Sequence, residues 1–270
     1  TELAEKLGIH LVPMQIVMDG ETYKDAIDLT IEEYNKKMET SKALPTTSQP
    51  AIGEFIKLYE EIEDYYDKII SIHPSSKLSG TLETAMIAAN QVNPEKITVF
   101  DSALVSILTG YLVLEAKRLV NVGKSYNVMM NRLMEMKERT VAFVMIENFD
   151  NLVRSGRLPR IAGKITKLAQ IKPILKISSK GIELEKIVRT SKRAFKKVDE
   201  IAHDYLEKLD YPARIDVAHG NLKKVAEEKF VNLASRYPDR QSEIYRLAAV
   251  IGVHTGPGIV GYTITPEYND

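Results

Sequence analysis

The fold of this chain is decided by residues 68–81, which read Lys68-Ile69-Ile70-Ser71-Ile72-His73-Pro74-Ser75-Ser76-Lys77-Leu78-Ser79-Gly80-Thr81. The run at 68–72 predicts a buried strand, and apolar residues recur at helical spacing after Thr81. The hydroxyls, the glycine and the free N–H groups of a first helical turn are able to hold an anion there without a lysine. A serine before a helix is also a common N-cap, so a cap and a ligand site are both open interpretations.

The composition narrows the class of protein. Among 270 residues, 37 Lys and Arg balance 37 Asp and Glu, so there is no overall basic excess to indicate a nucleic-acid partner. The absence of cysteine excludes disulfides, thiolate catalysis and cysteine-ligated metals. No apolar run reaches the length of a membrane span, and no signal peptide is recognised. We therefore expect a cytoplasmic protein without stable membrane insertion.

Strands and helices alternate in the first half of the chain, which is typical of a parallel α/β sheet. Expected strands cover residues 9–17, 68–72, 97–100 and 141–146, and expected helices cover residues 2–7, 30–38, 52–65, 81–91, 106–122 and 127–138. In such sheets the ligand crevice lies outside the carboxyl ends of the strands. The turn at 75–81 and the pair Asp101-Ser102 are both predicted at that edge.

The second half predicts an α+β domain with a mixed or antiparallel sheet. Expected strands cover residues 171–177, 182–188, 214–218, 243–250 and 259–264, and expected helices cover residues 191–209 and 222–236. A short basic, glycine-containing segment at 151–164 separates the two patterns. We therefore predict an N-terminal α/β domain at residues 1–155 and a C-terminal α+β domain at residues 156–270.

Four polar clusters are candidates for chemistry. They are Thr46-Thr47-Ser48, Ser79-Gly80-Thr81, Arg154 to Arg157, and His254 to Gly258. Each also has a structural interpretation. Thr47-Ser48 and the serine before Thr81 are candidate helix caps, and Arg157 is a candidate solvated surface charge. His254 is a candidate interior histidine, and Gly256 and Gly258 are candidates for shaping a turn.

Motifs of common enzymes are missing. The chain has no Gly-x-Ser-x-Gly elbow and no Gly-x-x-x-x-Gly-Lys-Ser/Thr loop. Its five histidines are scattered without metal-ligand spacing, so we predict no metal site and no cofactor. The polar residues of this chain are better suited to binding a small anion than to catalysing a reaction. We therefore predict no catalytic residue.

Six short motifs, in order along nearly the whole chain, resemble those of the DegV family. They are Thr47-Ser48-Gln49-Pro50, Leu78-Ser79-Gly80-Thr81, Phe100-Asp101-Ser102, Ser155-Gly156-Arg157, Arg189-Thr190 and His254-Thr255-Gly256-Pro257-Gly258. The resemblance implies two α/β domains with a long-chain fatty acid between them. It also implies a non-catalytic, fatty-acid-binding subunit of a bacterial fatty acid kinase. Such a subunit presents the carboxylate to a separate ATP-binding kinase subunit, which forms an acyl phosphate for phospholipid synthesis.

The resemblance also implies roles for residues at matching positions. Thr47 and Ser79 would hydrogen-bond the carboxylate, with Gly80 and Thr81 in the same substrate-binding turn. His254 would join this polar network, and Arg157 is similar to the family's arginine near the head group or the kinase-facing surface. The sequence departs from the family pattern in having Ser155 in place of a glycine, and in lacking the family's opening strand that ends in Asp-Ser.

Two other classes of function stay open on the residues alone. One is a stand-alone lipid or acyl hydrolase or transferase that uses Ser79 with His254, and it predicts turnover by the isolated protein. The other is a regulatory module that senses a lipid or a phosphate-bearing ligand, and it predicts binding that no kinase partner affects.

Overall fold

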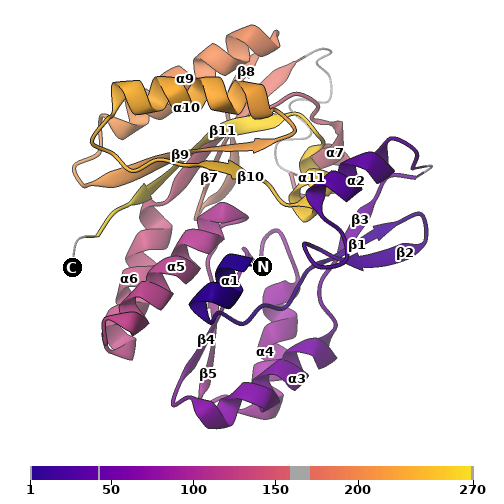
Figure 1. Cartoon of the computed structure of the whole chain (residues 1–270), viewed down its shortest axis with the longest axis vertical. Helices are drawn as coiled ribbons and strands as arrows, with labels where there is room; N and C mark the ends of the chain where they lie inside the picture. Colours follow the sequence, from indigo (N-terminus) through magenta and orange to yellow (C-terminus); the bar gives the residue numbers. More distant parts are fainter. Residues whose placement is uncertain (1, 42, 159–170, 269–270) are drawn as a thin grey trace. The chain divides into compact units, whose positions relative to one another are not determined.

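The computed structural model describes residues 2–41, 43–158 and 171–268 (Figure 1). The chain forms two compact units. The first unit comprises Thr1–Met134 and Ala248–Val253, and the second comprises Glu135–Leu247 and His254–Asp270. Residues 135–155, which the sequence-based division gives to the N-terminal domain, thus belong to the second unit. The physical reason is β6 (Val141–Ile146), which pairs with two strands of the second unit's sheet.

The first unit contains a small antiparallel sheet. Its strand order is β2-β1-β3, with bounds of Glu21–Lys24, Gln15–Met18 and Thr46–Ser48. Helix α1 (Glu2–Leu7) precedes it, and α2 (Ile31–Met38) begins at a capping box made by Thr30 and Glu33. The expected strand at 9–17 is therefore confined to its last residues and continues to Met18.

The strand, turn and helix predicted at residues 68–92 are confirmed. Strands β4 (Ile69–His73) and β5 (Ile97–Asp101) pair in parallel, as the alternating pattern predicts. Helices α3 (Ile52–Ile62) and α4 (Thr81–Val92) pack on this pair through the cluster that contains Phe55, Tyr59 and Ala85, and η1 (Glu63–Tyr65) follows α3. Helices α5 (Ile107–Asn121) and α6 (Tyr126–Arg139) follow in the chain.

The second unit is built on a six-stranded mixed sheet with the order β10-β9-β11-β6-β7-β8. The remaining bounds are β7 (Lys172–Ser178), β8 (Gly181–Val188), β9 (Ala213–Gly220), β10 (Ile244–Arg246) and β11 (Ile259–Pro266). Strands β9 and β10 are parallel, and the other pairs are antiparallel. Helix α7 (Asp150–Arg154) follows β6. The expected mixed or antiparallel sheet is thus present.

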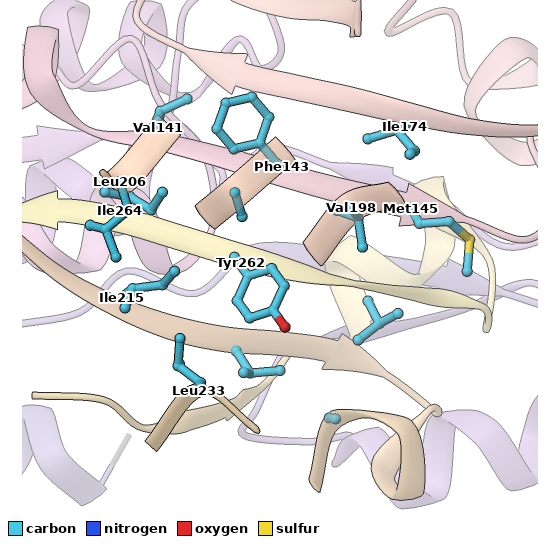
Figure 2. Close-up of a cluster of buried hydrophobic side chains, with 14 of the residues drawn as sticks. Val141, Phe143, Met145, Ile174, Val198, Leu206, Ile215, Leu233, Tyr262 and Ile264 are labelled. Atoms are coloured by element: carbon cyan, nitrogen blue, oxygen red, sulfur yellow. The ribbon is translucent and has the colours of Figure 1, made fainter. Parts of the chain in front are cut away.

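Helices α9 (Ser191–Leu206) and α10 (Lys223–Arg236) cover one face of this sheet (Figure 1). Figure 2 shows the core between these helices and the sheet, where alternate strand residues such as Phe143, Ile215 and Tyr262 face the helices. Successive side chains of a strand point to opposite faces of the sheet, so every second residue faces the helices, although β6 and β11 are buried along their whole lengths. This core fixes the scaffold of the second unit.

One predicted strand is wrong over most of its length. The expected strand at 243–250 is a strand only at Ile244–Arg246, and residues Ala249–Thr255 form helix α11. The start of α11 is held by Asp25, whose carboxylate accepts hydrogen bonds from the backbone N–H groups of Ala249 and Val250. An apolar run of this length does not distinguish strand from helix, and the deciding contact is remote in sequence.

Among the described residues, no helix is both long enough and apolar enough to span a bilayer.

Candidate functional site

Two loops at the carboxyl ends of β4 and β5 are tied together by hydrogen bonds. The Ser75 N–H donates to the Leu104 carbonyl over 2.7 Å, and the Ser76 hydroxyl donates to Oδ2 of Asp101 over 2.6 Å. Asp101 also accepts from the Ala103 N–H at 2.8 Å. The turn at 75–81 and the Asp101-Ser102 pair therefore lie together at one sheet edge, as the alternation of strands and helices predicts.

Ser79 and Thr81 form a hydrogen-bonded pair of hydroxyls at the start of α4. Their oxygens are 2.7 Å apart, and the Thr81 N–H donates to Oγ of Ser79 over 3.3 Å. The Thr81 hydroxyl also donates to Sδ of Met14 over 3.2 Å. The N-cap position is Gly80, which has no side chain, so Ser79 is not the side-chain cap of this helix. Thr81 is buried and Ser79 half-buried.

Thr47 lies in β3, opposite Ile16 of β1. The alternative interpretation of Thr47 as a helix cap is wrong, because α3 begins after Ala51 and has no side-chain cap. Two residues beyond Thr47, Nε2 of Gln49 donates to Oγ1 of Thr84 over 2.8 Å. This contact joins the end of β3 to the first turn of α4. Gln49 belongs to the motif Thr47-Ser48-Gln49-Pro50, but nothing in the sequence alone predicts this contact.

A buried relay in the first unit ends at His73, immediately before the turn. The Tyr59 hydroxyl donates to Oγ of Ser71 over 2.8 Å, and Ser71 Oγ lies 2.7 Å from Nε2 of His73. Burial lowers the pKa of His73 to about 4, although the negative charge of Asp101 opposes the shift. His73 is therefore neutral near pH 7, and its Nε2 shares a hydrogen bond with the Ser71 hydroxyl whose direction is set by the tautomer of the ring. No sequence signal identifies this relay, because Tyr59 and His73 lie on different elements.

In the second unit, His254 and Arg157 interact electrostatically. Burial and, to a smaller extent, the positive charge of Arg157 together lower the pKa of His254 to about 4. Arg157 is half-buried, and its Nη1 donates to the Ser155 carbonyl over 2.6 Å. The interpretation of Arg157 as a freely solvated surface charge is therefore wrong. His254 lies in the last turn of α11 and is half-buried and neutral.

The glycines after His254 serve close packing. A Cβ at Gly256 would lie 2.9 Å from Nδ2 of Asn151, and a Cβ at Gly258 would overlap the side chain of Glu147. Residues 256–261 also match the pattern Gly-x-Gly-x-x-Gly, but they lead into β11 and open no helix, so the structural context of a dinucleotide site is missing.

The structure thus groups the predicted site residues by unit. Ser79, Gly80 and Thr81 share one turn, and the Gln49–Thr84 bond ties the strand of Thr47 to it. His254 and Arg157 belong to the second unit and interact electrostatically with each other. Residues 159–164 of the basic segment lie outside the described residues. Over the described ranges, no group of three or more metal-ligating side chains is arranged to hold an ion.

The model of the DegV family matches residues 1–267 of this chain. The chain belongs to the DegV family. It is 35% identical over 261 residues to the protein DegV of Bacillus subtilis, an alignment that covers 96% of this chain and 92% of that protein. The resemblance read from the six motifs is confirmed.

Solved structures of DegV proteins have the same fold. The structure of DegV from Bacillus subtilis, a fatty acid binding protein, matches with a TM-score of 0.88 and 35% identity, over 98% of this chain and 94% of that chain. A fatty-acid-binding DegV family protein from Thermus thermophilus matches with a TM-score of 0.89 and 29% identity, over 98% of this chain and 95% of that one. The binding of fatty acids by DegV proteins is thus established for these relatives.

Proposed function

We propose that this chain binds a long-chain fatty acid and presents the carboxylate to a separate ATP-dependent kinase subunit, which forms the acyl phosphate. The observation that carries the binding half is the Ser79–Thr81 hydroxyl pair at the start of α4, in a chain that aligns end to end with fatty-acid-binding DegV proteins. Thr47 and Ser79 donate to the carboxylate in this proposal, and Gly80 and Thr81 complete the turn.

The hydroxyl pair is able to change its direction of donation when an anion arrives. In the structure the Thr81 hydroxyl donates to Sδ of Met14, and sulfur is a weak acceptor. A bound carboxylate needs a donor from Ser79. Thr81 then releases Met14 and donates to Oγ of Ser79, while the Ser79 hydroxyl donates to the carboxylate. The first-turn N–H groups of α4 add the favourable end of the helix dipole.

His254 supplies a neutral donor in this proposal. Because burial and Arg157 hold the pKa of His254 at about 4, the imidazole is uncharged near pH 7 and binds a carboxylate by hydrogen bonding. The alkyl tail supplies most of the affinity. Burying about fifteen methylene groups is worth on the order of 10 kcal/mol before the costs of association and ordering.

The binding half is tested by titrating palmitate into the wild-type chain and the Ser79→Ala and Thr47→Ala variants. A lost hydrogen bond to a charged group costs about 1.5–3 kcal/mol, so each variant is expected to bind about 10- to 100-fold more weakly. Ser179→Ala removes an exposed serine hydroxyl of the second unit that bonds only Glu138 among the described residues, and it is the matched control. Unchanged palmitate affinity in both site variants would refute the assignment.

The presentation half is tested with Arg157→Ala in a reconstituted reaction containing ATP and the kinase subunit. Arg157 is half-buried beside His254 and carries a fixed positive charge, so we expect this variant to keep palmitate affinity within about threefold and to lose at least about tenfold in acyl phosphate formation. Loss of palmitate binding with normal turnover per bound ligand would reverse this role. Hydrolysis of an acyl ester by the isolated chain, abolished in Ser79→Ala, would instead support an enzyme.

A further inference from the structure

Gln49 contacts the predicted carboxylate turn through both ends of its side-chain amide. Its Nε2 donates to Oγ1 of Thr84 over 2.8 Å. The Thr84 hydroxyl in turn donates to the Gly80 carbonyl over 3.3 Å, and the Thr84 N–H donates to the same carbonyl over 3.1 Å. Thr84 is buried, so its hydroxyl uses one acceptor and one donor bond inside the protein. The amide of Gln49 thus completes the hydrogen bonding of the first turn of α4.

The other end of the amide explains why residue 80 is glycine. The backbone of Gly80 has φ −76° and ψ 0°, which residues with side chains also adopt, so no positive φ requires glycine here. A Cβ at this position would overlap Oε1 of Gln49, and the three nearest atoms to it all belong to the Gln49 side chain. Gly80 therefore leaves room for the Gln49 amide.

We propose that Gln49 is a positioning residue whose amide clamps the end of β3 to the first turn of α4. This inference rests on the proposed function, because the clamp joins the two segments that carry Thr47 and Ser79. Two donors serve one carboxylate well only when their spacing is held to within a fraction of an ångström. By filling the space over Gly80 and bonding Thr84, Gln49 fixes that spacing in the ligand-free protein.

The clamp predicts that Gly80→Ala acts through Gln49. The overlapping atom is the far end of a flexible side chain, so the alanine methyl displaces the amide from Thr84 and leaves the backbone in place. Gln49→Ala removes the same contacts directly. The two substitutions break one interaction, so the double variant is expected to bind no more weakly than either single variant.

The test measures the affinity of the purified chain for palmitate and for hexadecanol, which has the same tail without the carboxylate. Gln49→Ala, Gly80→Ala and the double variant are each expected to bind palmitate about tenfold more weakly than wild type and hexadecanol within about twofold of wild type. Gln91→Ala, which removes an exposed glutamine from the same helix, is the matched control and is expected to change neither affinity.

Three outcomes separate the possibilities. Equal losses of affinity for palmitate and hexadecanol would mean that Gln49 supports the fold alone. Wild-type palmitate affinity in all variants would mean that the Gln49 contacts do not position the carboxylate donors. Either result overturns the inference and leaves the proposed function intact. A wild-type chain that binds neither probe overturns the proposed function. In that case, thermal unfolding of the ligand-free variants still tests whether Gln49 and Gly80 share one interaction. A loss in Tm in the double variant equal to the sum of the losses in Gln49→Ala and Gly80→Ala would refute it.

Discussion

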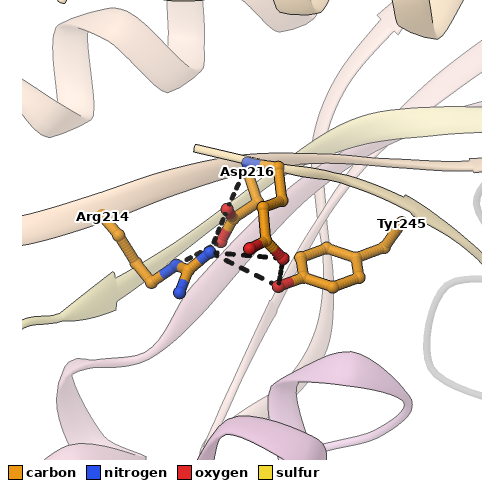
Figure 3. Close-up of polar contacts among 4 residues, drawn as sticks. Arg214, Asp216 and Tyr245 are labelled. Atoms are coloured by element: carbon orange, nitrogen blue, oxygen red, sulfur yellow. Dashed lines mark hydrogen bonds and ion pairs between the residues drawn. The ribbon is translucent and has the colours of Figure 1, made fainter. Parts of the chain in front are cut away.

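Two polar clusters in this protein differ in how completely their hydrogen bonds are satisfied. In the second unit, Figure 3 shows the guanidinium of Arg214 facing the carboxylate of Asp216, with Nε and Nη2 donating to the two oxygens over 2.8 and 2.7 Å. Asp216 is fully buried and also accepts from the Glu243 N–H at 2.8 Å, and Arg214 donates to the Tyr245 hydroxyl at 3.3 Å. Both carboxylate oxygens of Asp216 and two guanidinium nitrogens of Arg214 are therefore hydrogen-bonded within this cluster.

The Ser79–Thr81 pair in the first unit has weaker partners. Its two hydroxyls bond each other, and the Thr81 hydroxyl also donates to the sulfur of Met14, which is a weak acceptor. Ser79 is half-buried and carries no charge partner among the described residues. A saturated buried network stabilises a fold, whereas hydroxyls with weak acceptors exchange partners at low cost when a ligand arrives. We expect this difference between a structural cluster and the binding cluster that we propose around Ser79 and Thr81.

The largest expected effect comes from breaking the saturated cluster. Arg214→Met leaves the Asp216 charge buried without its bidentate partner, so we expect the free energy of unfolding to fall by about 3–5 kcal/mol, measured by urea denaturation. The control is Lys223→Ala, which removes an exposed ion pair with Glu227 and is expected to cost less than about 0.5 kcal/mol. A loss in Arg214→Met as small as in the control would show that the network carries little stability.

An intermediate effect is expected from the relay that ends at His73. The pKa of His73 is lowered by burial from 6.5 to about 4, so the unfolded chain binds its proton more readily between these values. Stability attributable to His73 is therefore complete above about pH 6.5 and is lost as the pH falls toward 4, by about 1.4 kcal/mol per pH unit.

The variant His73→Asn keeps a hydrogen-bonding partner for Ser71, because an amide both donates and accepts, and it cannot titrate in this range. Its free energy of unfolding, measured by urea denaturation from pH 7 to pH 4, is expected to fall less steeply than that of wild type by about 1 kcal/mol per pH unit. Equal slopes in the two proteins would mean that His73 is protonated as readily in the folded chain as in the unfolded one.

The smallest effect is expected from a substitution at Met14, which contacts the Ser79–Thr81 turn. Met14→Leu removes the sulfur acceptor of Thr81 with little change in volume, so the Thr81 hydroxyl is left to donate to Ser79. We expect palmitate affinity to rise by about two- to threefold and the free energy of unfolding to change by less than about 1.5 kcal/mol. A weakening as large as that expected for Ser79→Ala would show that Met14 supports the site and does not compete for its hydroxyls.

Local signals in the sequence predict much of the fold. The capping box of Thr30 and Glu33 is present, and the strand and helix around residues 68–92 begin and end close to their expected positions. The assignment of 243–250 as one strand fails because Asp25, which lies far away in the chain, holds the start of α11. The short strand Thr46–Ser48 is missed because three polar residues between prolines have no strand periodicity.

The sequence predicts the candidate site about as completely as it predicts the fold. Ser79, Gly80 and Thr81 are adjacent in the chain, so their shared turn follows from local sequence alone. The contacts with Met14, Gln49 and Thr84 depend on packing between elements, and no spacing rule identifies them. The effect of Arg157 on His254 is likewise a tertiary interaction between residues almost a hundred positions apart.

We propose that this chain carries a long-chain fatty acid. The most direct measurement is native mass spectrometry of the purified protein, followed by organic extraction and identification of any released molecule. We expect one equivalent of a long-chain fatty acid, or one equivalent taken up from added palmitate or oleate, and reduced retention in Ser79→Ala. A protein that is free of lipid and takes up neither acid would contradict it.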